Sequence, residues 1–373
     1  MGCACEKRNA FRKVAELTVI PTYACNFNCT YCFVHHSWDE VPSYRVMNRR
    51  IVDSIIEFFI PERVEKEFSF WFFGGEPLMP EVRDTVIYAA ERVREVAKEH
   101  CIQVTVGATT NGYYLGEDFI EWCLQQNFRL LISYDGYHNQ RIFRGRKGYR
   151  KEDAEVVEEN IRMLHATEKG RALAPTAAMQ VPPSGLKGLY ENVMSAFDLG
   201  FRNVALNKVT GRTGGYSGED IRILERELSR LVEFLMRERS KPQEQRRSVE
   251  FLLRKAGFLC SPSFLSKQVF HMDNSCGAAK GSLSVGPDGS IYPCQRLHFS
   301  KFWLGNVEGK FFLSKRIALA EHIPSRCHGC EVRCSPCYAA SYEMTGNIDS
   351  ILLHECKYER LLFRKAGKLV GRA

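Results

Sequence analysis

The sequence predicts an α/β fold with a parallel sheet, followed by a cysteine-rich region. Over the first 210 residues, six apolar or β-branched runs alternate with helical patterns. This alternation is typical of parallel strands joined by right-handed crossover helices. Six such units fit a partial, TIM-like (β/α)6 barrel better than a complete barrel of eight. After residue 276, glycine and cysteine are frequent and helical periodicity is weak, which indicates a second domain.

The strands and helices of the predicted barrel can be assigned in order. Helical patterns cover "NRRIVDSIIEFFI" (48–60), which ends before Pro61, and "PEVRDTVIYAAERVREVAKEH" (80–100). The expected domains are a tail (1–13), the barrel (14–215), a helical bridge (216–275), the cysteine-rich domain (276–357) and a C-terminal helix or tail (358–373). The predicted strands are 14–20, 68–73, 102–109, 128–134, 172–181 and 203–209.

Composition excludes several functional classes. The chain has 373 residues, of which 45% are hydrophobic and 12% aromatic, as in a folded globular protein. No run approaches the roughly 18 apolar residues of a membrane span, and the charged N-terminus lacks the apolar centre of a signal peptide. We therefore expect a cytoplasmic protein with no membrane partner. The net charge of +8 comes from scattered basic residues, so no nucleic-acid partner is expected.

Three cysteines lie within eight positions in "YACNFNCTYCF" (23–33), directly after the first predicted strand. In a reducing compartment, the chain's 15 cysteines favour metal or redox chemistry over disulfides. A closed zinc site needs four ligands, so Cys25, Cys29 and Cys32 would leave one coordination position open. The motifs "GGEP" (74–77), "TNG" (110–112) and "SYDG" (133–136) end the next three strands. Chemistry in parallel α/β folds lies at that edge of the sheet.

These motifs together resemble the radical S-adenosylmethionine enzymes. The resemblance implies that Cys25, Cys29 and Cys32 bind three irons of a [4Fe–4S] cluster, and that the fourth iron binds the amino and carboxylate groups of S-adenosylmethionine. A zinc loop with a distant fourth ligand is the alternative. Arg141 competes with Arg144 as the clamp on the S-adenosylmethionine carboxylate. The remaining cofactor contacts implied by the resemblance are Gly74, Gly75 and Glu76 for the amino group, and Asn111 and Ser133 for the ribose or carboxylate.

The C-terminal cysteines resemble a SPASM domain, which holds two auxiliary iron–sulfur clusters. "CHGCEVRCSPC" spaces its cysteines as C-x2-C-x3-C-x2-C, whereas the family usually has C-x2-C-x5-C-x3-C. Paired CxxC motifs also occur in zinc ribbons, which remain an alternative. Cys260 is expected as the fourth ligand of the first auxiliary cluster; otherwise it is a hydrogen-atom donor, or the site is open. By order, the first auxiliary cluster would bind Cys276, Cys294 and Cys337, and the second would bind Cys327, Cys330, Cys334 and Cys356.

The resemblance also implies a reaction. An electron from a flavodoxin- or ferredoxin-type donor would cleave S-adenosylmethionine and generate a 5′-deoxyadenosyl radical, which abstracts a substrate hydrogen. Relatives of this type mostly modify peptides or proteins, and a dehydrogenase or epimerase of a sugar or cofactor precursor is the alternative. The sulfatase-maturing branch has an acid after the cysteine of its "YPCD" segment. This chain has Gln295 there, which disfavours formylglycine formation.

Overall fold

The computed structural model describes residues 13–36, 45–249, 277–322, 330, 332, 334 and 336–369. One sheet of ten strands organises these residues, in the order β10-β9-β8-β1-β2-β3-β4-β5-β6-β7. Strands β8 and β1 to β7 are parallel neighbours, whereas β9 and β10 pair antiparallel. The strands are β1 (Val14–Val19), β2 (Val64–Phe72), β3 (Gln103–Thr110), β4 (Arg129–Ser133), β5 (Thr176–Val181), β6 (Asn203–Lys208), β7 (Ser248–Val249), β8 (Ser282–Val285), β9 (Ser290–Tyr292) and β10 (Gly305–Asn306).

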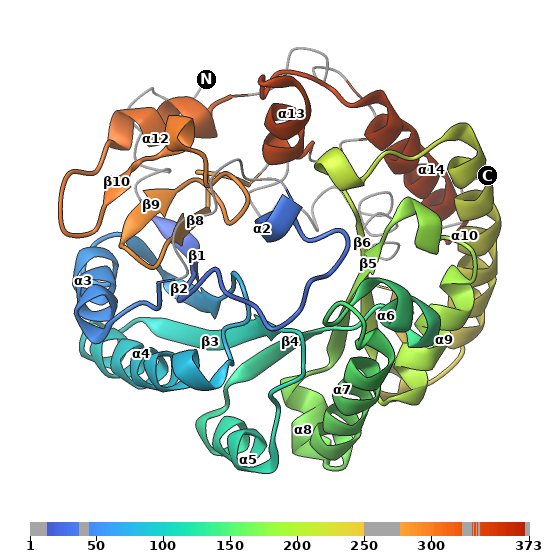
Figure 1. Cartoon of the computed structure of the whole chain (residues 1–373), viewed down its shortest axis with the longest axis horizontal. Coiled ribbons are helices and arrows are strands. Elements are labelled where there is room, and N and C mark those ends of the chain that lie inside the picture. Colours follow the sequence, from blue (N-terminus) through green and yellow to red (C-terminus); the bar gives the residue numbers. More distant parts are fainter. Residues whose placement is uncertain are drawn as a thin grey trace.

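The sheet curves around a central space, and most helices lie outside it (Figure 1). Since β10 and β7 are the two edges of the strand order, the described sheet does not close. This arrangement confirms the predicted partial barrel. The helices of eight residues or more are α3 (Arg49–Phe59), α4 (Pro80–Glu99), α5 (Glu117–Gln126), α7 (Arg150–His165), α9 (Leu189–Asp198), α10 (Gly218–Glu238), α12 (Leu313–Ala320), α13 (Tyr338–Thr345) and α14 (Leu353–Leu369). The shorter ones are α2 (Phe33–His36), α6 (Tyr137–Phe143), α8 (Glu168–Leu173) and the 3₁₀ turns η1 (Pro183–Gly185), η2 (Gly211–Thr213), η3 (Gln243–Gln245) and η5 (Ser300–Phe302).

Local sequence explains where the first helices begin and which strand faces are buried. Asn48 caps α3 by accepting a hydrogen bond from the Ile51 N–H at 3.0 Å, and Pro80 starts α4. In β2, alternate side chains take opposite faces of the sheet. Phe68, Phe70 and Phe72 are therefore buried on the helix side, while Trp71 faces the central cavity. No helix among the described residues combines the length and the apolarity needed to cross a membrane.

Several sequence expectations were wrong in detail. The second strand begins at Val64 rather than at residue 68. The fifth strand begins at Thr176 rather than at residue 172, because Thr167 caps a short helix that continues to Leu173. Pro175 then separates the helix from the strand, since it has no N–H to donate. The apolar neighbours of Cys101 and Cys123 predict buried structural thiols, the first in a strand and the second on a helix. Cys101 is instead exposed in the turn after α4, with φ of 54°, whereas Cys123 is buried.

The cysteine-rich region joins the barrel sheet. Strand β8 pairs in parallel with β1, so that Leu17 lies opposite Leu283 and Val19 opposite Val285. Both members of these pairs are fully buried. The domain boundary at residue 276 therefore stays a prediction. In the structure, β8 extends the barrel sheet beside β1, on the side of β1 opposite β2.

Candidate active site

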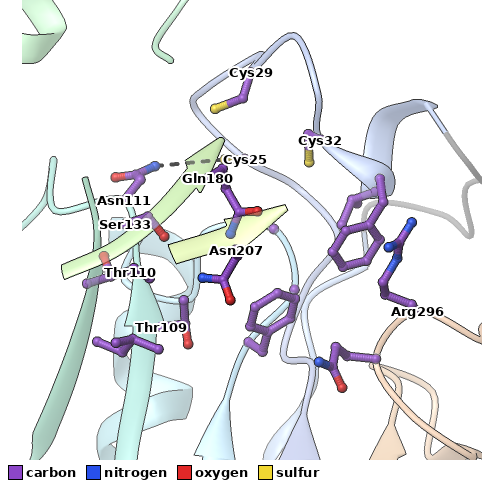
Figure 2. A pocket seen from close by; sticks show the side chains of 18 of the residues that line it. Cys25, Cys29, Cys32, Thr109, Thr110, Asn111, Ser133, Gln180, Asn207 and Arg296 are labelled. Carbon is purple, nitrogen blue, oxygen red and sulfur yellow. Dashed lines mark hydrogen bonds between the residues drawn. The ribbon is translucent and has the colours of Figure 1, made fainter. Parts of the chain in front are cut away.

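A cavity of about 670 Å³ lies inside the barrel, at the carboxyl ends of the strands. The sequence-predicted residues that line it are Cys25, Cys29, Cys32, Gly74, Gly75, Glu76, Asn111, Ser133 and Arg144. Figure 2 shows the three cysteines on the loop above the strand ends, with Asn111 and Ser133 on one side and Arg296 on the other. Eight sequence segments thus contribute to one space, as expected where parallel strands end together.

Backbone hydrogen bonds on both sides hold the cysteine loop (residues 22–32). On one side, Gly75 N donates to Thr22 O at 3.0 Å, and Glu76 N donates to Ala24 O at 2.8 Å. On the other side, the loop's Asn28 and Thr30 N–H groups donate to the carbonyls of residues 145 and 143, each at 3.0 Å. The loop is therefore fixed between the turn after β2 and the segment after α6.

The two glycines of "GGEP" are required by this close approach. A Cβ on Gly75 would lie 1.8 Å from the carbonyl oxygen of Ala24, which is far inside contact distance. Gly74 has φ of +127°, and a Cβ there would lie 2.5 Å from the Ile20 side chain. Glycine is the residue that tolerates both the positive φ and the missing space. The motif consequently brings a backbone turn against the cysteine loop.

Glu76 is buried beneath the loop and anchors the end of β3. Its carboxylate accepts hydrogen bonds from Asn111 N at 2.7 Å, Thr110 Oγ1 at 2.8 Å and Leu78 N at 3.0 Å. Burial raises the pKa of Glu76 to about 7, although these donors favour the charged form. A carboxylate offers about four acceptor positions, so these three donors leave room for one more. Glu76 thus connects the turn after β2 to the end of β3, a structural role that the sequence did not reveal.

Arg144 is buried beside the cysteine loop. Its Nη1 donates to the Tyr31 hydroxyl at 2.8 Å, and that hydroxyl donates to Asp135 Oδ2. Burial lowers the pKa of Arg144, but Tyr31, Cys29 and Asp135 together raise it well above its ordinary value, so the guanidinium is charged. Among the described residues, Arg144 Nε has no hydrogen-bond partner. This buried donor indicates a site for an acceptor group.

The competing arginine faces away from this site. Both terminal nitrogens of Arg141 donate to the Glu158 carboxylate, at 2.6 and 3.0 Å, and its guanidinium lies 3.8 Å from the centre of the Tyr137 ring. Arg141 does not line the cavity, whereas Arg144 does. The geometry therefore favours Arg144 as the residue that meets a bound anion.

The surroundings of the three thiols fit an iron–sulfur cluster. Phe27 N donates to Cys25 Sγ at 3.4 Å, and Asn111 Nδ2 lies 3.9 Å from the same sulfur (Figure 2). Burial, the Glu76 carboxylate and the other two cysteines raise the pKa of Cys25 well above its ordinary value. Burial and Cys29 likewise raise the pKa of Cys32 to about 11. Three thiols are thus close enough to repel one another as thiolates, which a bound cationic cluster would relieve.

Among the described residues, no three Cys, His, Asp or Glu side chains converge as ligands of a single metal ion. A four-iron cluster does not require such convergence, because each cysteine binds a different iron.

Sequence reasoning missed most of the polar cavity wall. Thr109, Gln180 and Asn207 face the cavity from the ends of β3, β5 and β6 (Figure 2). Lys208 lines it as well, and its ammonium pairs with two carboxylates of α14. The available signal was a polar residue near the end of a predicted strand, as in "AAMQV" and "ALNK". That signal is weak because polar residues at strand ends are ordinary.

The described C-terminal cysteines form two groups. Cys294 and Cys337 pack against the same small apolar cluster. Cys330 and Cys356 are close enough for one to raise the pKa of the other, although burial is the larger cause for Cys356. Lys208 interacts electrostatically with Cys334 and Cys356. The division of these cysteines between two auxiliary clusters stays a prediction. Cys260, Cys276 and Cys327 lie outside the described residues.

Comparison with known proteins finds a family match for part of the barrel. Residues 19–170 match the profile described as the radical SAM superfamily. A cysteine-type anaerobic sulfatase-maturating enzyme of Clostridium perfringens is 29% identical over 117 residues. This match covers 30% of the present chain and 30% of that enzyme, so the aligned stretch spans less than a third of the relative's length.

Two solved structures share the fold over nearly the whole chain. A structure described as native anSMEcpe with bound AdoMet and Cp18Cys peptide has a TM-score of 0.74 at 19% identity, covering 95% of this chain and 98% of that one. Streptococcus suis SuiB bound to precursor peptide SuiA has a TM-score of 0.62 at 15% identity, covering 93% and 76%. At these identities the similarity establishes the fold, including the region after the barrel.

Proposed function

We propose, from the premise that residues 19–170 match the radical SAM superfamily, that the chain reductively cleaves S-adenosylmethionine in order to modify a peptide or protein. The observation that carries the proposal is the meeting of the cysteine loop, the "GGEP" turn and Arg144 around one cavity. Each element alone has an ordinary structural explanation. Their convergence at the carboxyl edge of a parallel sheet is what a shared cofactor site requires.

Cys25, Cys29 and Cys32 would hold a [4Fe–4S] cluster, as the N–H groups directed at Cys25 Sγ support. When bound, the cluster and S-adenosylmethionine supply a 5′-deoxyadenosyl radical that can abstract hydrogen from an unreactive C–H bond. The protein's own contribution is orientation and exclusion of water. Phe33, Trp71 and Phe73 provide an apolar part of the wall, which limits access of competing hydrogen donors.

Arg144 would meet the carboxylate of S-adenosylmethionine, and the "GGEP" turn would meet its amino group. The unpaired Arg144 Nε supports the first contact, and the remaining acceptor capacity of Glu76 supports the second. Asn111 and Ser133 lie on the same wall and would contact the ribose or carboxylate. Arg144→Gln is expected to weaken S-adenosylmethionine binding at least about tenfold, the equivalent of one lost charge-assisted hydrogen bond. Arg141→Gln, which alters a cation outside the cavity, should leave the dissociation constant unchanged.

Two auxiliary clusters would occupy the C-terminal cysteines, with Cys294 and Cys337 in one and Cys330, Cys334 and Cys356 in the other. The two spatial groups of described thiols support this assignment. Cys276 and Cys260 would complete the first, and Cys327 the second. Such clusters accept or conduct electrons, and a flavodoxin- or ferredoxin-type protein would supply the reducing electron.

A peptide or protein substrate is supported by the structural neighbours whose descriptions name bound peptides. The cavity of about 670 Å³ is large enough for a side chain in addition to the cofactor. Gln295 lines this cavity where an acid would serve as base in formylglycine formation. Because an amide cannot accept a proton at neutral pH, we propose that the modification is of another type.

The decisive experiment compares iron content and S-adenosylmethionine cleavage in anaerobically reconstituted protein. The wild-type chain should hold about 11 to 12 irons, from three four-iron clusters. Replacing Cys25, Cys29 and Cys32 together with alanine should remove about four irons and abolish formation of 5′-deoxyadenosine. Undiminished 5′-deoxyadenosine would overturn the radical proposal. A wild-type chain with about four irons and bound zinc would instead overturn only the auxiliary clusters.

A further inference from the structure

Arg296 connects the cavity wall with a cysteine outside the radical SAM loop. It lies two residues after Cys294, lines the cavity, and is placed opposite Asn111 and Ser133 in Figure 2. Its Nη1 donates toward Cys337 Sγ at 3.7 Å. Cys337 directly precedes α13. A single side chain therefore reaches from the proposed substrate space to a proposed cluster ligand.

The guanidinium of Arg296 is held in this orientation from several directions. Its Nη1 also donates to Thr210 Oγ1, and its Nη2 pairs with Glu343 Oε2 at 3.3 Å. The guanidinium carbon lies 5.0 Å from the centre of the Phe33 ring. Glu343 is itself buried and accepts from Arg212 N at 2.8 Å. Because its partners come from three segments, Arg296 cannot turn toward a substrate without breaking them.

Fixed hydrogen bonds and charges next to a ligating sulfur affect the reduction potential of an iron–sulfur cluster. Reduction adds one negative charge, which a nearby cation stabilises and a nearby carboxylate destabilises. Arg296 Nη1 donates directly toward the sulfur, whereas Glu343 contacts the other terminal nitrogen, Nη2. The two residues should consequently shift the potential in opposite directions.

We propose that Arg296 is a positioning residue that raises the reduction potential of the first auxiliary cluster through Cys337. The inference rests on the proposed assignment of Cys294 and Cys337 to that cluster. It adds a determinant of redox behaviour that the cysteine pattern does not contain, in a residue that itself lines the cavity.

The test is a redox titration of the anaerobically reconstituted full chain, monitored by electron paramagnetic resonance, with iron and sulfide measured in each sample. Arg296→Gln should retain its iron and lower the potential of one auxiliary cluster. At a fixed applied potential, the reduced-to-oxidised ratio of that cluster should fall about tenfold, which is about 59 mV for a one-electron couple. Arg296→Lys should recover part of the loss, and Glu343→Gln should shift the potential upward.

Arg230→Gln is the matched control. Arg230, on α10, also pairs with a glutamate, Glu191, at 2.5 Å and stacks at 4.2 Å on an aromatic ring, Tyr190. Both partners lie on α9, and Arg230 does not line the cavity. The reduction potentials of the clusters in Arg230→Gln should equal those of wild type. If Arg296→Gln keeps its full iron and has the reduction potentials of wild type, the inference is overturned. Shifts of the same sign in Arg296→Gln and Glu343→Gln would also overturn it, because they indicate that both substitutions act by loosening the packing.

If Arg296→Gln loses a cluster, Arg296→Lys and Glu343→Gln still decide the question. Unshifted potentials in both would make Arg296 a structural contact only, against the proposal. A wild-type chain without auxiliary iron would overturn the cluster assignment together with this inference. Auxiliary iron in wild type with unshifted variants would overturn the role of Arg296 alone.

Discussion

The cysteine loop after β1 and the cysteine segments near the C-terminus are held by different kinds of contact. The loop with Cys25, Cys29 and Cys32 is fixed by backbone hydrogen bonds to residues 75, 76, 143 and 145. The described C-terminal cysteines are held by charged side chains. Lys208 pairs with Glu355 and Glu359 on the helix that carries Cys356, and Arg296 pairs with Glu343 on the helix after Cys337.

This difference predicts different sensitivities to mutation. A backbone-held loop depends little on which side chains flank it, but it fails where a new atom prevents two backbones from approaching. Segments held by buried ion pairs tolerate changes in backbone detail but fail when one charge is removed, since its partner remains buried and unpaired. The following substitutions separate the two cases.

Gly75→Ala should have the largest effect. Its Cβ would meet the Ala24 carbonyl oxygen at 1.8 Å, and neither backbone can move without losing the hydrogen bonds of the loop. We expect destabilisation of about 5 kcal/mol or more, with loss of the iron bound at Cys25, Cys29 and Cys32. Chemical denaturation and iron analysis measure the two effects. Gly116→Ala is the control, because no atom lies within 4 Å of its added Cβ. A wild-type-like Gly75→Ala protein would contradict the backbone account.

Lys208→Met should come next. It leaves the Glu355 and Glu359 carboxylates buried without their common partner, which costs about 3 to 5 kcal/mol. Iron loss should be confined to the C-terminal cysteines, so cleavage of S-adenosylmethionine should outlast the auxiliary clusters on mild heating. Lys241→Met serves as the comparison, because the Lys241–Glu238 pair is half-exposed and should contribute less than about 1 kcal/mol. Equal losses in both variants would refute the distinction.

His298→Gln should have a pH-dependent effect. His298 hydrogen-bonds to Tyr23 at 2.8 Å and to Ser284 at 2.9 Å, and burial lowers its pKa to about 3. The unfolded chain, with a pKa of about 6.5, binds this proton first. Wild-type stability should therefore fall as pH drops from about 6.5 toward 3, by about 1.4 kcal/mol per pH unit from this group.

The variant should show a shallower decline in unfolding free energy over the same pH range. Some dependence should remain, because His165 is also buried with a lowered pKa. Parallel curves for wild type and His298→Gln would show that His298 is not the titrating group. Since Tyr23 belongs to the cysteine loop and His298 follows Cys294, this bond also links the two regions.

Arg50→Ala should have the smallest effect. Arg50 Nε lies 2.9 Å from Glu308 Oε1 and joins α3 to the segment after β10, but its side chain is 81% exposed. Exposed ion pairs contribute about 0 to 1 kcal/mol and are screened by salt. The unfolding midpoint should change within error, and added salt should remove any difference. A loss comparable to that of Lys208→Met would show that exposed contacts hold the two regions together.

The sequence by itself determined the order of strands and helices, because side-chain periodicity and helix caps act locally. The alternation in β2 and the Asn48 cap of α3 follow from neighbouring residues. It also determined which motifs share one edge of the sheet, since parallel strands end on the same side. For that reason Cys25, Glu76 and Asn111 could be expected together from spacing alone.

Only the tertiary structure decided which side chains from distant segments contact each other. The sequence left Arg144 and Arg141 as rivals, and only the fold directs one into the cavity and pairs the other with Glu158. It likewise decided that Lys208 faces the carboxylates of α14, and that Arg296 meets Cys337, 41 positions away. Such contacts depend on how whole helices and strands pack against one another. No local sequence pattern predicts them, because neither residue of a pair is distinguished by its neighbours in the chain.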